Sequence, residues 1–237
     1  MLKDKQIWVF KEGRAGSNWF CHALEKKIKR TAFHYERERY LDFHLYRTGK
    51  DPEFVTEVFK KEAIFLRDKT KFYATPYLEF LYHAHLLHKD TILIRLTRKN
   101  RVEHCLSILA FLMFSHSSRT HSFVNPITML GNRYASTDFY SKPEYVTKQQ
   151  VKKIMKNFKK KDDIWNSYSN NHTNFVVSYE DLEKGVEIEP LSITMRFSDE
   201  TSFIKKNPSY KEKAFANYDQ IVEWCNEYEV EFNLKQH

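Results

Sequence analysis

The sequence predicts an α/β fold in which a mainly parallel sheet is covered by helices on both faces. Three short runs have the β-branched and aromatic composition of buried parallel strands, at 6–11, 90–96 and 173–179. Helical periodicity follows the first two of them, over 19–30 and 101–115. Strands that alternate with helices are typical of a parallel sheet, and this alternation predicts the fold class.

The remaining segments complete this outline. A fourth strand is predicted over 62–68, and apolar residues at helical spacing predict a helix through 151–165, with lysines at the positions between them. The stretch 116–145 contains Pro126, Gly131 and Pro143 among many Ser, Thr and Asn residues, and we interpret it as a loop or lid insertion. At 237 residues, the chain 1–237 is interpreted as a single domain.

Charge and cysteine content narrow the classes of partner. The formal charge of +8 favours anionic partners, which include nucleic acid, a nucleotide and an acidic membrane surface. The three cysteines stand far apart in the sequence and suggest neither a disulfide framework nor a CxxC metal clip, so we expect a reducing compartment. The longest apolar run, 108–114, is too short to span a membrane and the N-terminus lacks a signal core, so we expect a cytoplasmic protein.

The turn between the first strand and its helix contains two of the five glycines of the chain, Gly13 and Gly16. Glycine at such a turn lets the backbone wrap an anion, and the first N–H groups of the helix are available to bind it. The alternative is a plain connecting turn with Ser17 or Asn18 as the helix N-cap. The glycine spacing excludes both a Walker A loop and a dinucleotide-binding fingerprint.

Four segments resemble, in order, the motifs of sulfotransferases that use 3′-phosphoadenosine 5′-phosphosulfate (PAPS), most of all bacterial carbohydrate sulfotransferases. GRAGSNW, at 13–19, is similar to the loop that binds the 5′-phosphosulfate. In LTRKNRVEHCLS, at 96–107, an Arg and a Ser nine positions apart resemble the element that binds the 3′-phosphate. VVSYEDLEKG, at 176–185, and FIKKNPSYKEKAFANYDQIVEW, at 203–224, resemble later segments of these enzymes.

The resemblance implies a P-loop-like three-layer fold and a transfer of a sulfuryl group from PAPS to a hydroxyl of a carbohydrate or other small acceptor, with no metal. It implies nucleotide contacts by the loop and by the second element, namely Arg14, Ala15, Gly16, Ser17, Asn18, Trp19, Arg98 and Ser107. Arg14 would also stabilise the bridging oxygen as the nucleotide leaves. Glu12 departs from the family pattern, and its carboxylate opposes anion binding unless it points away from the pocket.

The resemblance also implies a general base, for which the sequence offers several side chains. Glu36 is our first candidate and Glu38 our second, with His85 in reserve. Lys69 or Lys71 is a loose match to a family lysine. Tyr179 and Asp181 are expected to organise the fold, the run 111–114 to be core, and the histidines at 83, 85 and 88 not to bind a metal.

Two other functions stay open. The lysines of 152–161 and an aromatic content of 16% suit a nucleic-acid-binding module, although a solvated helix face is the simpler explanation of these lysines. The altered glycine loop also suits a relative that binds a nucleotide without catalysis.

Overall fold

The computed structural model describes residues 5–34, 66, 68–76, 78, 87–115, 143–197 and 210–234. These residues form two compact units, one within 1–99 and 162–201 and the other within 100–161 and 202–237. The single-domain organisation of the chain stays a prediction. Most of the expected insertion, 116–142, lies outside the described residues.

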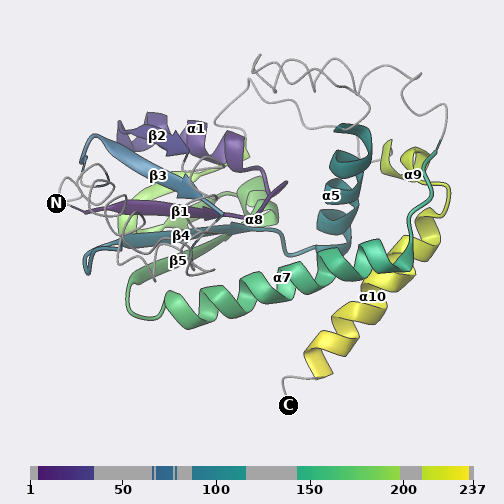
Figure 1. Cartoon of the computed structure of the whole chain (residues 1–237). Helices are drawn as coiled ribbons and strands as arrows, with labels where there is room; N and C mark the ends of the chain where they lie inside the picture. The colour runs from purple at the N-terminus through teal and green to yellow at the C-terminus, as the bar shows by residue number, and fades with distance from the viewer. Residues whose placement is uncertain are drawn as a thin grey trace, which may run out of the picture. The chain divides into compact units, whose positions relative to one another are not determined.

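The first unit is an α/β unit built on a five-stranded sheet (Figure 1). Its strands are β1 (Ile7–Lys11), β2 (Thr31–His34), β3 (Lys71–Thr75), β4 (Ile92–Thr97) and β5 (Thr173–Ser178), in the order β2-β3-β1-β4-β5. Every pairing in this sheet is parallel. The predicted fold class is therefore confirmed.

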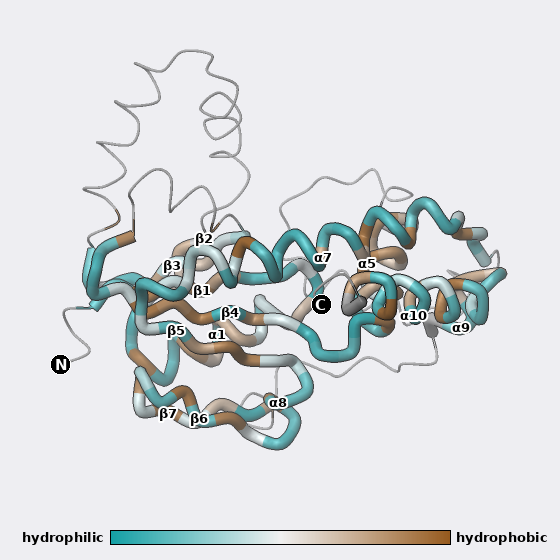
Figure 2. Tube along the Cα trace, turned by 90° about the horizontal axis from the view of Figure 1, so that it is seen from below, coloured by the Kyte–Doolittle hydropathy of each residue, from teal (hydrophilic) through white to brown (hydrophobic). Residues whose placement is uncertain are grey.

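Helices flank the sheet because its strands are apolar on both faces. Alternate side chains of the two central strands, Trp8, Phe10 and Leu93, pack in one cluster with Trp165 of α7 (Lys148–Tyr168). The neighbouring positions of β1, Ile7 and Val9, point to the other face and are also buried. Helix α1 (Ser17–Ile28) buries Trp19, Phe20, Cys21, Ala23 and Leu24. Figure 2 shows the strands as largely hydrophobic and α7 as largely hydrophilic.

The three principal strand predictions are confirmed, with one difference in burial. β5 is one of the two edge strands of the sheet, and Thr173, Asn174 and Val176 are exposed. The run 173–179 was expected to be buried because its apolar composition matches that of a central strand. Composition cannot distinguish a central strand from an edge strand when one half of the strand is covered.

The predicted strand at 62–68 is wrong for its described residues, since Leu66 and Asp68 lie outside any strand and β3 begins at Lys71. The Asp68 carboxylate accepts hydrogen bonds from the backbone N–H of Thr70 (2.9 Å) and from its hydroxyl (2.6 Å). Such a bond from Asp to the residue two positions on defines a turn. The turn at Asp68 delays the strand until Lys71.

A helix and a hairpin complete the first unit. α8 (Tyr179–Lys184) follows β5 directly. An antiparallel pair, β6 (Val186–Ile188) and β7 (Ile193–Met195), comes next and is joined by the 3₁₀ turn η4 (Glu189–Leu191). The backbone at Gly185 has a φ of 94°, and an added Cβ there would lie 2.8 Å from the Arg196 side chain, so this turn requires glycine.

The second unit is helical. It contains α5 (Arg101–Ser115), the first part of α7, α9 (Tyr210–Ala214) and α10 (Tyr218–Leu234). The apolar stripe of α7 is buried in its core, as predicted. The expectation that 111–114 is core is wrong for Phe111 and Leu112, which are 39% and 47% exposed. Each shares a helix face with a residue buried earlier in α5, since Phe111 lies one turn after Ser107 and Leu112 two turns after Cys105. Exposure therefore changes along α5, and apolar character alone misled the assignment.

Two cysteines that are distant in the sequence meet in the core of this second unit. Cys105 and Cys225 are both buried, and their side chains are hydrogen bonded. This hydrogen bond, together with burial, raises the pKa of the Cys105 thiol far above its usual range. The two thiols are in contact without a disulfide, and none of the three cysteines is joined to another by a disulfide. Within the described ranges, no helix is long and apolar enough to cross a membrane.

Candidate anion-binding site

The connections of the sheet diverge at the carboxyl ends of β1 and β4. The chain leaves β1 toward β2, on one side, whereas β4 is adjacent to β5 on the other. In open parallel sheets, ligands bind where the connections diverge in this way, outside the carboxyl ends of the strands. Three segments of the first unit follow strands at this edge, namely 12–16 after β1, 98–99 after β4 and α8 after β5.

The loop after β1 presents an uncapped helix start. Gly16 is the N-cap of α1, with a φ of 78°, and no side chain caps the helix. The alternative in which Ser17 or Asn18 is the N-cap is therefore wrong, since the helix already begins at Ser17. The first backbone N–H groups of α1 have no side-chain acceptor of this kind and point toward the loop.

The other loop residues hold this turn in shape. Arg14 adopts the left-handed conformation, with a φ of 66°. Ala15 is buried, and its N–H donates to the carbonyl of Glu12 (3.3 Å). The Ala15 N–H is thus engaged within the turn, whereas the guanidinium of Arg14 is half-buried at the loop.

The two glycines of this loop differ in what they contact. A Cβ added to Gly16 would lie 2.9 Å from the ring of Tyr179, the first residue of α8. A Cβ added to Gly13 would meet nothing within 4 Å, and the backbone at Gly13 does not have a positive φ. Both the conformation and the space around Gly16 therefore require glycine, and neither does so at Gly13.

Tyr179 connects this loop with the segment after β4. The guanidinium carbon of Arg98 lies 4.4 Å from the centroid of the Tyr179 ring, a cation–π contact. The same ring lies against Gly16. The predicted 5′ loop and the predicted 3′-phosphate arginine thus share one aromatic neighbour at the carboxyl edge of the sheet.

Arg98 is held in place but incompletely hydrogen bonded. Its side chain is only 14% exposed, and its Nε atom is buried without a hydrogen-bond acceptor among the described residues. The nearest carboxylate oxygen, Oε1 of Glu180, lies 3.8 Å from this Nε, which is too long for a hydrogen bond. Ser107, the predicted partner of Arg98, is buried in α5 of the other unit, and their joint contact with a phosphate stays a prediction.

The adjacent residue, Lys99, ties the segment after β4 to the start of α8. The backbone N–H of Lys99 donates to Glu180 (2.9 Å), and its Nζ donates to Asp181 (2.6 Å). Asp181 also completes a capping box with Ser178. Burial raises the pKa of Asp181, but the hydrogen bonds from Lys99 and Ser178 outweigh burial and hold it below its usual range. The expectation that Asp181 organises the fold is confirmed.

Aromatic side chains lie beside the loop and Arg98. The ring of Phe197 has its centroid 4.6 Å from the Trp19 ring and 4.6 Å from the Tyr179 ring. Trp19 is 4% exposed, and within the described ranges its indole Nε1 has no hydrogen-bond acceptor. A buried donor in this state is uncommon in folded proteins, which makes Trp19 a candidate contact for a polar ligand group.

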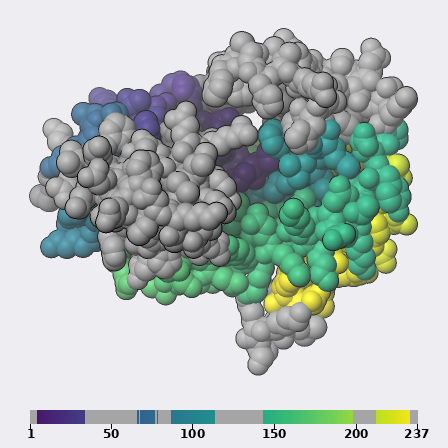
Figure 3. Space-filling view, in the orientation of Figure 1, coloured from purple at the N-terminus to yellow at the C-terminus, as the bar shows by residue number. Residues whose placement is uncertain are grey.

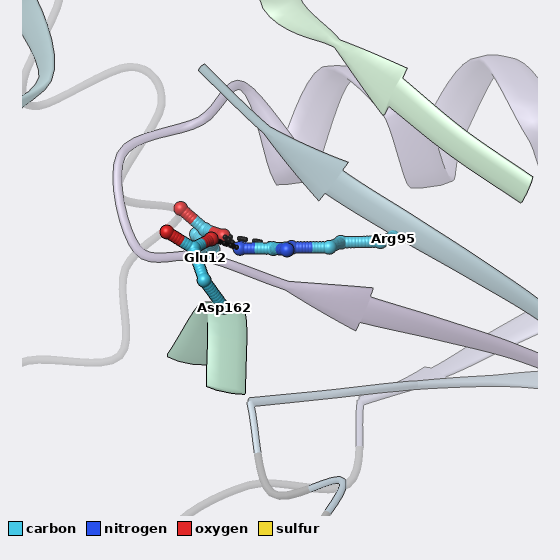
Figure 4. A network of polar contacts seen from close by, with 3 residues as sticks. All are labelled: Glu12, Arg95 and Asp162. Atoms are coloured by element: carbon cyan, nitrogen blue, oxygen red, sulfur yellow. Dashed lines mark hydrogen bonds and ion pairs between the residues drawn. The ribbon is translucent and has the colours of Figure 1, made fainter. Parts of the chain in front are cut away.

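Glu12, the unfavourable carboxylate of the loop, is fully buried and turned toward β4 (Figure 4). Its Oε1 accepts a hydrogen bond from Nε of Arg95 (3.0 Å), and Arg95 also donates to Asp162 of α7. Burial lowers the pKa of Arg95, and the two carboxylates outweigh burial and raise it. The charge of Glu12 is therefore paired with Arg95, which also forms an ion pair with Asp162.

Several predicted site residues lie outside the described part of the chain. These are Glu36, Glu38, His83 and His85, so the choice of a general base stays a prediction. Lys71 begins β3 and forms an ion pair with Asp68 (2.7 Å), which explains it as a turn residue, and Lys69 is exposed. His88 is described near Asp90, with 3.8 Å between Nδ1 and a carboxylate oxygen.

Sequence reasoning missed Glu180, Lys99, Phe197 and the role of Tyr179 beside the loop. For Tyr179 and Lys99 a signal was present, because Tyr179 is the last residue of the predicted strand 173–179 and Lys99 follows Arg98 after the predicted strand 90–96. The carboxyl ends of parallel strands meet at one edge of a sheet. Phe197 offered no signal, since the distance along the chain from Trp19 to Phe197 says nothing about their contact.

The other candidate sites are less suited to binding a metal ion or a small ligand. Among the described residues, no three His, Cys, Asp or Glu side chains come together as a metal site. A shallow hollow in the second unit is lined by residues of α10 alone, between Tyr218 and Val230. One exposed helix face encloses no ligand, so we place the candidate site at the strand ends.

Comparisons of the chain with protein-family models, with curated proteins and with solved structures gave no match.

Proposed function

We propose that this protein is a sulfotransferase that takes a sulfuryl group from PAPS and transfers it to a hydroxyl of a carbohydrate or other small acceptor. The observation that carries the proposal is the Tyr179 ring, which contacts both Gly16 and Arg98. The glycine loop and the segment after β4, which we propose to bind the two ends of one nucleotide, therefore contact the same side chain. A ligand with two anionic groups separated by a nucleoside suits such a pair of positions.

The loop and the aromatic residues supply the proposed contacts. The uncapped N-terminus of α1 and the guanidinium of Arg14 suit the 5′ anion, because both offer donors and positive charge. Arg98 suits a second phosphate, since it has an unbonded Nε donor. The partly exposed rings of Tyr179 and Phe197, which contact each other, offer apolar surface beside these two groups, which suits a nucleoside.

In the proposed reaction the donor supplies an activated sulfuryl group. The acceptor oxygen forms a bond to sulfur while the bond from sulfur to the bridging phosphate oxygen breaks. Arg14 stabilises the negative charge that develops on that leaving oxygen, and Glu36, with Glu38 as the alternative, takes the acceptor proton. Glu12 does not oppose the anion, because its carboxylate is paired with Arg95.

Calorimetric titration with adenosine 3′,5′-bisphosphate tests this proposal, with adenosine 5′-monophosphate as the comparison. We expect the bisphosphate to bind more tightly, and Arg98→Ala with Ser107→Ala to remove most of the difference. Charge-assisted hydrogen bonds contribute about 1.5–3 kcal/mol each, which corresponds to roughly one to two orders of magnitude in affinity. Equal affinity of the wild-type protein for both nucleotides would remove the main support for the proposal.

A nucleic-acid-binding function is the second candidate, favoured by the exposed lysines of α7. Lys153, Lys156 and Lys160 lie on the exposed face of this helix, and residues of α7 contribute to the surface in Figure 3. Their spacing places them along one side, as phosphate binding requires. Retention on DNA or RNA that falls steeply with salt, and that is lost on charge reversal at these three lysines, would support this function over the first.

A further inference from the structure

Arg98 lies among acidic as well as basic side chains. Two acidic and two basic side chains meet where the segment after β4 contacts the start of α8. They are Arg98 and Lys99, with Glu180 and Asp181. Their formal charges cancel, so the site proposed for a phosphate is locally neutral in the absence of a ligand. An anion gains little from a cation whose charge is already balanced.

Glu180 is the carboxylate that balances Arg98. Its Oε2 accepts a hydrogen bond from the Lys99 N–H at 2.9 Å, while its Oε1 lies 3.8 Å from Nε of Arg98. The first contact fixes the carboxylate, and the second leaves the arginine donor without a hydrogen bond. The Coulombic contact is therefore formed, but the hydrogen-bonding capacity of Arg98 is left for another acceptor.

Asp181 does not balance the charge of Arg98 in the way that Glu180 does. Its carboxylate accepts from Nζ of Lys99 at 2.6 Å and from the backbone N–H of the N-cap Ser178. It is thus engaged in capping α8. Glu180 is 32% exposed and does not take part in that capping box, so its side chain can move without loss of the cap.

We propose that Glu180 is an internal competitor for the anion site at Arg98, and that a ligand phosphate displaces its carboxylate from the guanidinium. This inference rests on the proposed function, because it presumes an anionic ligand at Arg98. A phosphomonoester displaces a carboxylate readily, since it carries up to two negative charges and three terminal acceptor oxygens. A phosphodiester or a carboxylate, with a single charge, does so poorly. Glu180 thus makes the site selective for a terminal phosphomonoester.

The test compares three proteins by calorimetry: the wild type, Glu180→Gln and Glu183→Gln. Glutamine keeps an acceptor for the Lys99 N–H but removes the charge near Arg98. Glu183 lies on the same helix and is exposed, so its variant loses the same charge without changing this contact. The probes are adenosine 3′,5′-bisphosphate and adenosine 5′-monophosphate.

We expect Glu180→Gln to bind the bisphosphate roughly two- to fivefold more tightly than the wild type, as removal of a partly exposed ion pair permits. Affinity for the monophosphate should be unchanged in both variants, and Glu183→Gln should match the wild type with both probes. A higher affinity of Glu180→Gln for the bisphosphate alone confirms the competitor role.

The other outcomes separate the inference from the proposed function. If the wild type prefers the bisphosphate and Glu180→Gln binds it equally or more weakly, the competitor role is overturned and the proposed function stands. If neither the wild type nor Glu180→Gln binds the bisphosphate, both are overturned. Equal gains in Glu180→Gln and Glu183→Gln would show a general effect of net charge and would also overturn the inference.

Discussion

Arg98 lies over the ring of Tyr179, with 4.4 Å between the guanidinium carbon and the ring centroid, and this contact joins the ends of β4 and β5. The Tyr179 ring also occupies the space beside Gly16 at the end of β1. A single aromatic side chain thereby sets the distance between the two segments that we propose for anion binding. Substitutions at this junction are expected to affect ligand binding more than their burial alone suggests.

The two glycines of the loop provide a matched pair of variants. Gly16→Ala should lower the free energy of unfolding by about 1–3 kcal/mol, because it combines a positive φ with a Cβ that would lie 2.9 Å from Tyr179. It should also weaken binding of adenosine 3′,5′-bisphosphate. Gly13→Ala should change neither by a measurable amount. Urea unfolding and calorimetry measure the two effects, and equal effects of both substitutions would contradict this account of the loop.

Arg14→Ala should lower turnover much more than it weakens nucleotide binding. The proposed contact with the leaving oxygen strengthens as charge develops, so it acts mostly in the transition state. Steady-state rates with PAPS, set beside the affinity for adenosine 3′,5′-bisphosphate, measure the two quantities. A loss of affinity as large as the loss of turnover would show that Arg14 contributes to binding alone.

The buried cluster around Arg95 predicts unequal effects of its two carboxylates. Glu12→Gln should destabilise the protein by about 1–3 kcal/mol, because it weakens charge-assisted hydrogen bonds at a fully buried carboxylate while Arg95 keeps only the partly exposed Asp162. Asp162→Asn should cost about 1 kcal/mol or less, because Asp162 is 35% exposed and Arg95 keeps Glu12. Chemical denaturation of the two variants decides this, and a larger effect at Asp162 would show that the helix contact dominates.

The stabilising contribution of Asp181 to the first unit should be lost in acid. Its pKa is lowered in the folded protein from the ordinary value of 3.8, so its contribution to stability is present above about pH 4 and is lost as the pH falls through the folded pKa. The difference in unfolding free energy between the wild type and Asp181→Asn should therefore be largest near neutral pH and shrink below pH 4. A difference independent of pH between 2 and 7 would mean that the charge of Asp181 does not contribute.

Those parts of the molecule that depend on local periodicity and on backbone conformation could be predicted from the amino-acid sequence. β1 and β4 are continuous apolar runs, and α1 and α5 repeat their apolar residues at helical spacing, so each was predictable from its own residues. The loop glycine was likewise predictable, because a tight turn into a helix favours the left-handed conformation that Gly16 adopts.

Which of these segments lie in contact depends on the packing of the whole chain. The position of Tyr179 between Gly16 and Arg98, and the pairing of Glu12 with Arg95, depend on the strand order β2-β3-β1-β4-β5. That order is set by packing between residues far apart in the chain, which a local pattern does not encode. For the same reason the edge position of β5 could not be predicted, whereas its existence as a strand could.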